Sequence, residues 1–160
     1  MALHPFGLSV FSNVPLWAAF FSWCSAQAIK FASDFVRTRR FDFRYFVSTG
    51  GMPSAHSATV SGLATSIGLV EGWDSSVLAL SSVFAIITMF DAATVRRAAG
   101  LQAKVLNEIV DEMRKDRRLR AAKLKELLGH TRKEVLAGFA WGIAFSSVFT
   151  MVCARIGAAA

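Results

Sequence analysis

The sequence contains few of the residues that build disulfide-linked, metal-bound or linker-rich proteins. Its 160 residues include two cysteines, three prolines and one tyrosine. Cys24 and Cys153 lie far apart inside apolar runs, so their spacing favours neither a disulfide framework nor a zinc site. No repeats or low-complexity linkers divide the chain, and we expect a single domain over residues 1–160.

Acidic residues are scarce as well. Eleven Asp and Glu stand against eighteen Lys and Arg, for a formal net charge of +7, although 54% of the residues are hydrophobic. Soluble domains of this size rarely combine the two properties. No nucleic-acid recognition motif accompanies the basic residues, and acidic lipid headgroups account for the charge as well. We therefore expect a lipid bilayer as partner, and no nucleic acid.

The apolar residues are concentrated in four stretches, at residues 14–35, 55–70, 76–94 and 134–156. The second is rich in Ser, Thr, Gly and Ala, which suits a helix packed inside a bundle. Residues 98–120 show apolar positions at four-residue intervals, typical of an amphipathic helix, in an insertion that ends at about residue 123. These features predict an all-α polytopic membrane helix bundle, with about four transmembrane helices and one amphipathic cytoplasmic or interfacial helix.

The distribution of charge predicts the orientation of this bundle. The segment 96–133 carries twelve basic and five acidic residues, whereas the turn between the second and third spans carries only Glu71 and Asp74. The positive-inside rule therefore places the basic loops in the cytoplasm and both termini on the opposite side. The N-terminus lacks a basic n-region, so the first apolar run is expected to remain as a span. A bacterial plasma membrane and an organellar membrane fit equally well.

Polar side chains from separate stretches fall at the cytoplasmic ends of these spans: Lys30, Arg37, His56, Asp91, Arg96 and His130. Hydrolysis of a phosphate ester requires cations or backbone donors around the phosphoryl oxygens, a nucleophile, and an acid for the leaving group. Histidine can serve as the nucleophile without a metal. These side chains could therefore converge on one phosphate site, which would lie at the cytoplasmic face.

Each histidine has two interpretations. Ser54 and His56 lie at an expected helix start, where backbone N–H groups and the helix dipole favour an anion; a capping segment with an exposed histidine fits equally well. His130 precedes Glu134 by four residues, so the carboxylate could orient the imidazole for attack. Alternatively, His130 is a surface histidine near a helix start.

The cations also have two interpretations. Lys30 and Arg37 are seven positions apart near a helix end, where they can bind phosphate or meet lipid headgroups. Arg96 and Arg97 can do the same. Asp91 lies about one turn inside an apolar span, where a carboxylate is costly unless it is paired. We expect it to contact Arg96, Arg97 or a histidine.

Together these segments resemble the three phosphatase motifs of the type 2 phosphatidic acid phosphatase (PAP2) and vanadium haloperoxidase superfamily. The matching residues are Lys30 with Arg37, Pro53-Ser54-Ala55-His56, Arg96, and Gly129-His130 followed by Glu134-Val135-Leu136-Ala137-Gly138. The runs 48–58, 90–97 and 124–131 are similar to its divergent branch, the acid phosphatase/vanadium-dependent haloperoxidase-related membrane proteins.

The resemblance implies a metal-independent phosphoric monoester hydrolase without a cofactor, acting on a lipid-type phosphate ester or diphosphate. In this scheme His130 would form a phosphohistidine, Glu134 would orient it, and His56 would protonate the leaving oxygen. The phosphate ligands would be Lys30, Arg37, Ser54 and Arg96 or Arg97, with Asp91 as a supporting residue. The substrate would be amphiphilic, and a homo-oligomer is compatible with the sequence.

Departures from the superfamily pattern leave a second prediction open. Thr38, Ala55, Val95 and Glu134 replace a proline, a glycine, a serine and an aspartate, in that order. Arg96 and His130 are 34 positions apart, whereas ordinary members have the two within two helical turns. The site closes only if the inserted helix folds back so that these residues meet. The alternative is a non-catalytic membrane protein on a PAP2-like scaffold that binds anionic lipid or a protein partner.

Overall fold

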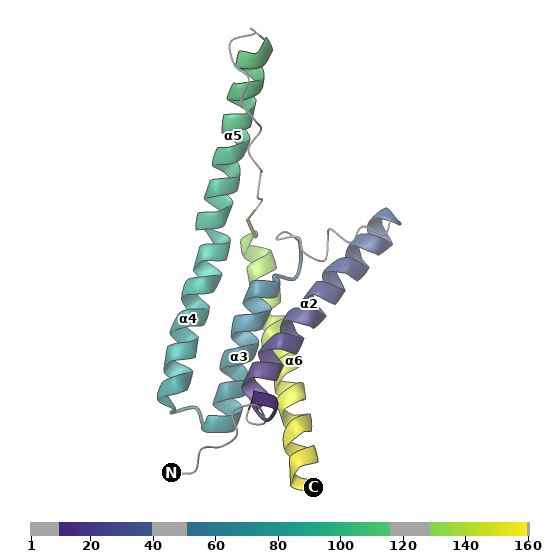
Figure 1. The fold of residues 1–160 in the computed structure, drawn as a ribbon, viewed down its shortest axis with the longest axis vertical. Coiled ribbons are helices and arrows are strands. Elements are labelled where there is room, and N and C mark those ends of the chain that lie inside the picture. The colour runs from purple at the N-terminus through teal and green to yellow at the C-terminus, as the bar shows by residue number, and fades with distance from the viewer. Residues whose placement is uncertain (1–9, 40–50, 116–128, 160) are drawn as a thin grey trace.

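The computed structural model describes residues 10–39, 51–115 and 129–159, most of which are helical (Figure 1). The helices are α2 (Val14–Thr38), α3 (Ala55–Glu71), α4 (Ser76–Ala93), α5 (Val95–Lys115) and α6 (Arg132–Ala159). No strand occurs in this part of the chain. The predicted all-α class is therefore confirmed. The last residues of the predicted insertion, 116–123, lie outside the described residues.

Polar side chains define where the first helices begin. Asn13 Oδ1 accepts a hydrogen bond from Leu16 N at 3.0 Å ahead of α2, and Ser75 Oγ accepts one from Leu78 N at 3.1 Å ahead of α4. Ser54 caps α3 in the same way, as predicted. Each cap satisfies an N–H group that has no partner within its helix and contributes about 1 kcal/mol.

Helix α3 is the inner helix and packs against α2, α4 and α6. Its small polar side chains form hydrogen bonds with α6: Ser61 Oγ donates to Phe139 O at 3.1 Å, and the hydroxyls of Ser66 and Thr150 are 2.8 Å apart. Small side chains permit this close approach of two helices. The Ser-, Thr-, Gly- and Ala-rich composition of residues 55–70 is therefore explained by their position inside the bundle.

Helices α4 and α5 follow one another almost without interruption and form a long rod that extends past the other helices (Figure 1). The break is at Thr94, whose N–H bonds to Phe90 O while its own carbonyl accepts from Ala98 N at 2.8 Å. Because both groups stay paired, helical geometry resumes at once. The amphipathic helix consequently begins at Val95, earlier than the predicted residue 98.

Two helical stretches are long and apolar enough to cross a membrane, Ser76–Met113 and Arg132–Ala158. Large side chains on α4 such as Leu80 and Phe84 are exposed, which suits contact with lipid. Among the described residues α2 and α3 do not meet the same criterion, and α3 has only 17 residues. The count of four spans, like the orientation of the chain, stays a prediction.

Candidate active site

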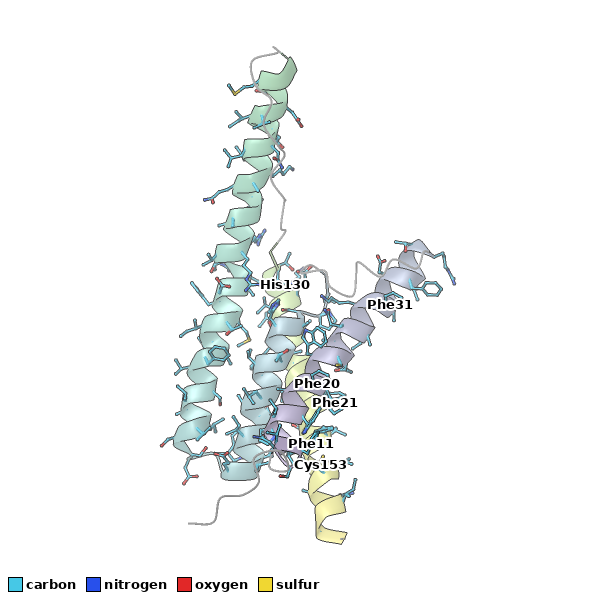
Figure 2. The ribbon with its side chains drawn as sticks, viewed as in Figure 1. Phe11, Phe20, Phe21, Phe31, His130 and Cys153 are labelled. Carbon is cyan, nitrogen blue, oxygen red and sulfur yellow. The ribbon has the colours of Figure 1, made fainter. Side chains whose placement is uncertain are left out.

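The two histidines of the predicted site lie together at one end of the bundle. This is the end at which α3 and α6 begin and α4 finishes, and Figure 2 labels His130 there. The ring centroids of His56 and His130 are 6.0 Å apart, with an angle of 65° between the ring planes. Residues that are distant in the sequence are thus brought into contact range.

The start of α6 sets the orientation of His130. Thr131 and Glu134 form a capping box, because Thr131 N donates to Glu134 Oε2 at 2.9 Å and Glu134 N donates to Thr131 Oγ1 at 3.3 Å. The same Oε2 lies 3.3 Å from His130 Nδ1. One carboxylate therefore caps the helix and holds the imidazole. Sequence reasoning missed Thr131, although a threonine three residues before a glutamate is the signature of this motif.

The other ring nitrogen of His130 is buried and unpaired. The residue is only 2% exposed, and Nε2 has no hydrogen-bond partner among the described residues. A carboxylate beside Nδ1 keeps the proton on that nitrogen, which leaves a lone pair on Nε2. This atom is therefore free to bind or attack a ligand.

Burial lowers the pKa of His130 below its usual value of 6.5. The hydrogen bond and the charge of Glu134 act in the opposite direction, whereas the charges of Lys30 and Arg96 lower the pKa further. The net shift is downward, so the ring is neutral at pH 7. A neutral imidazole is the form that can act as a nucleophile.

This lowered pKa predicts how stability depends on pH. The unfolded chain takes up a proton on this histidine near pH 6.5 and the folded chain only at lower pH, so the free energy of unfolding should fall as pH drops through that window. We expect the Tm of the detergent-solubilised protein to decrease more steeply between about pH 7 and pH 5 than the Tm of His130→Gln. Parallel curves for the two proteins would contradict this expectation.

The first turns of α3 and α6 are bound to each other. The buried Ser54 donates its N–H to Glu134 O at 3.0 Å, while its Oγ accepts from the N–H of Ser57 at 3.4 Å and from its hydroxyl at 3.1 Å. Gly138 lies directly on this segment, since a Cβ there would come within 3.0 Å of Ser54 N. The absence of a side chain at residue 138 thus lets the two histidine-bearing segments meet.

Lys30 extends to the site from α2. It is 4% exposed, and its stem lies against Gly51, where an added Cβ would be 3.3 Å from Lys30 Cδ. Its charge acts on both histidines and on Glu134. The predicted partner Arg37 has its backbone in α2, but its side chain lies outside what the structure describes.

The separated halves of the third motif come together at Gly129. A Cβ on this residue would be 2.6 Å from Arg96 C and from Arg97 Cα, so only a glycine fits. Arg96 Nε donates to Asp91 Oδ2 at 3.0 Å, the type of contact that was predicted for this carboxylate. The charge of Arg96 also acts on His130, whereas Arg97 supplies the backbone against which Gly129 packs.

The chemical character of the site follows from these groups. Within residues 10–39, 51–115 and 129–159, no three His, Cys, Asp or Glu side chains gather so that they could hold a metal ion. The groups that do gather are two imidazoles, a carboxylate, a hydroxyl and two cations. Such a set can bind a tetrahedral anion and offers both a nucleophile and a proton donor.

Comparison with known proteins agrees with the motifs. Residues 11–145 match the model of the Divergent PAP2 family. The chain is 41% identical over 152 residues to a Bacillus subtilis (strain 168) protein named Uncharacterized membrane protein YuiD, with 88% of this chain and 96% of the relative covered. No solved structure matches the chain. The predicted resemblance is confirmed, and the chain is a membrane protein that belongs to the divergent PAP2 family.

Proposed function

We propose that this protein is an integral-membrane phosphatase that hydrolyses a lipid-type phosphate ester or diphosphate through a phosphohistidine intermediate. The observation that supports it best is His130 Nε2, which is buried without a partner on a ring held by Glu134 and facing His56. Leaving such an atom unpaired costs free energy, roughly 1–3 kcal/mol. A phosphoryl group bound at Nε2 would account for that cost.

The reaction would proceed in two steps. The lone pair of His130 Nε2 attacks phosphorus, the P–N bond forms, and the bond from phosphorus to the leaving oxygen breaks as protonated His56 gives that oxygen its proton. His56 then takes a proton from water, whose oxygen attacks phosphorus and displaces the histidine. Phosphate leaves and both imidazoles return to their starting forms. Glu134 stabilises the positive charge on the His130 ring between the two steps.

The remaining groups would stabilise the charge on the phosphoryl oxygens. The charges of Lys30 and Arg96 act on both histidines, and the N–H groups at the start of α3 offer further donors. Arg37 is proposed as an additional cation because of its position in the first motif. By the positive-inside rule the site would face the cytoplasm, with both termini on the opposite side.

The role assigned to His56 predicts a dependence on the leaving group. His56→Ala should slow phosphate release from an alkyl phosphate by about 10²–10⁴-fold, because an alkoxide needs a proton to leave. With p-nitrophenyl phosphate the loss should be much smaller, since nitrophenolate leaves without a proton. The measurement is kcat for both substrates on purified protein in detergent. Equal losses on the two substrates would exclude His56 as the leaving-group acid.

A non-catalytic membrane protein that binds anionic lipid or a partner is the second candidate. The apolar face of α5 favours it, because Leu101, Val105 and Ile109 are about half exposed on a helix that extends past the bundle. Assays on phosphatidic acid, phosphatidylglycerol phosphate and prenyl diphosphates separate the two. If neither His56→Ala nor His130→Ala changes phosphate release, the phosphatase proposal is wrong and the binding-protein proposal remains.

A further inference from the structure

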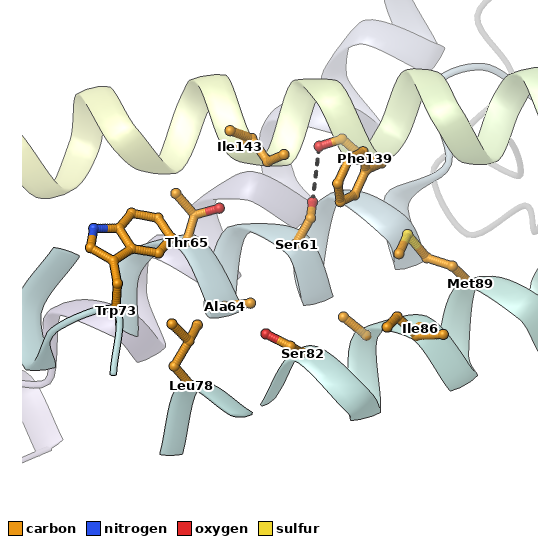
Figure 3. Close-up of a pocket in the computed structure, with 11 residues that line it drawn as sticks. Ser61, Ala64, Thr65, Trp73, Leu78, Ser82, Ile86, Met89, Phe139 and Ile143 are labelled. Atoms are coloured by element: carbon orange, nitrogen blue, oxygen red, sulfur yellow. Dashed lines mark hydrogen bonds between the residues drawn. The ribbon is translucent and has the colours of Figure 1, made fainter. Parts of the chain in front are cut away.

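A groove with a volume of about 290 Å³ opens between α3, α4 and α6 (Figure 3). Its floor is formed by small residues of α3 and its walls by apolar side chains of α4 and α6: Ser61, Ala64, Ile86, Met89, Phe139 and Ile143. The Ser61–Phe139 hydrogen bond drawn in Figure 3 links the floor to one wall. The lining is chiefly apolar.

The groove exists because α4 packs closely against α3 but makes much less contact with α6. The α4 side chain Ile86, which lines the groove, is 63% exposed, and its neighbours Phe84 and Ile87 are more than half exposed as well. Surfaces of this kind on a membrane-spanning helix face lipid tails. The groove is therefore accessible sideways, from the region that the hydrocarbon of the bilayer occupies.

One end of the groove adjoins the histidine site. On each of the three helices a site residue stands five or fewer positions from a groove residue, namely His56 and Ser61, Asp91 and Met89, and Glu134 and Phe139. At 1.5 Å per residue these pairs are at most about 8 Å apart along the helix axes. Cations and imidazoles thus lie at the end of an apolar groove, which matches an anionic head on a hydrocarbon chain.

Trp73 lines the opposite end of the groove (Figure 3). One face of its indole packs on Gly68, where an added Cβ would come within 2.9 Å of the ring atoms Cε3 and Cζ3. Leu78 of α4 lies near it in the same wall (Figure 3). From Leu78 to Met89 the helix measures about 16 Å, which limits the length of a chain that can lie extended along it.

We propose that this groove binds the single hydrocarbon chain of an amphiphilic phosphate whose head reaches His130, and that Trp73 sets the chain length that fits. The reaction part of this inference rests on the proposed phosphatase, but binding of the chain can be tested without turnover. The groove thereby assigns a substrate class, a phosphate with one saturated or prenyl chain of medium length.

Binding is tested by photolabelling of the full-length His130→Ala protein in phosphatidylcholine vesicles. The probe is dodecyl phosphate with a diazirine on its terminal carbon, and labelled peptides are identified by mass spectrometry. We expect labels concentrated around Trp73 and Leu78, where the end of the chain would lie, and we expect unmodified dodecyl phosphate to displace the probe. Ala64→Phe, which fills the floor, should reduce them about tenfold. Ala154→Phe, on an exposed face of α6 outside the groove, should not.

Turnover is tested in the protein with both histidines intact. Ala64→Phe should raise KM for dodecyl phosphate about tenfold and leave KM for phenyl phosphate unchanged, because the short substrate does not enter the groove. Trp73→Ala should shift the preference from dodecyl towards hexadecyl phosphate, and Trp73→Phe should restore the original preference.

The outcomes separate the two proposals. If the labels spread evenly over the lipid-exposed faces and do not respond to Ala64→Phe, the proposal that the groove binds the chain is wrong. This conclusion holds whether or not the protein releases phosphate. Labelling confined to the groove, with no phosphate release from any substrate, would support the chain site and overturn the phosphatase. A probe displaced by a second copy of the chain, detected as a cross-linked dimer through the same residues, would assign the groove to oligomerisation and overturn the lipid site.

Discussion

His130→Ala should abolish phosphate release, with kcat falling by roughly 10⁴-fold or more. The substitution removes the only atom of the site that combines a lone pair, burial and the absence of a partner among the described residues. It should also remove an acid-labile, alkali-stable phosphoryl label that wild-type protein acquires when it is quenched during turnover. Phosphate release and the label are measured on the same purified samples.

Helix content of the variant and turnover of a second histidine variant serve as controls for His130→Ala. Glu134 still caps α6 through Thr131 in the variant, so the helical circular dichroism signal should match wild type. His4→Ala, at a histidine outside the motifs and outside the described residues, should retain full turnover. A rate for His130→Ala within tenfold of wild type would rule out a phosphohistidine intermediate at this residue.

Gly129→Ala should lower phosphate release by about 10²-fold while leaving the protein folded. The new Cβ would meet the backbone of Arg96 and Arg97 at 2.6 Å, so the loop that holds His130 must move away from α5. Overpacking of this kind costs about 1–3 kcal/mol, and a displacement of about 1 Å at a reacting group is enough for the loss in rate. The readouts are kcat and the thermal unfolding temperature.

Gly157→Ala is the matched control, because a Cβ at that position meets nothing within 4 Å. It lies inside α6, where alanine is more favourable than glycine by about 0.5–1 kcal/mol, so its Tm should rise slightly and its rate should not change. The φ angle of Gly129 lies outside the left-handed region, which leaves contact rather than backbone strain as the cause. Wild-type turnover by Gly129→Ala would show that the two halves of the third motif need not be held together.

The helices of the fold were predictable because each carries a continuous apolar or periodic pattern, and the predicted starts at residues 14, 55 and 76 are confirmed, but the end of the first helix and both ends of the last were not predicted. The first helix was expected to end at residue 35 and continues to Thr38, and the last was expected over 134–156 and spans Arg132–Ala159. Apolar runs indicate what lies in the bilayer. Arginine and lysine are good helix formers, so a helix continues past the apolar run into charged residues.

The sequence named His56, His130 and Glu134, which the structure brings together, but it did not predict the backbone contacts that hold them there. The motifs named both histidines, and the spacing of four residues between His130 and Glu134 predicted that these two share a helix face. The contact of Gly129 with Arg97 and the groove towards Trp73 depend on how distant segments return to each other. No periodicity in the sequence predicts how distant segments pack against each other. A glycine in a motif does not reveal which backbone it contacts.

Glu134 both caps α6 and holds the His130 ring, and this affects when the site can form during folding. Its Oε2 holds the Thr131 N–H and the His130 ring at once, and a capping box uses glutamate or glutamine at this position, where the superfamily has aspartate. The imidazole therefore takes its orientation only when the first turn of α6 has wound. In the proposed phosphatase, a newly synthesised chain would therefore have no oriented nucleophile until the first turn of its final helix has formed.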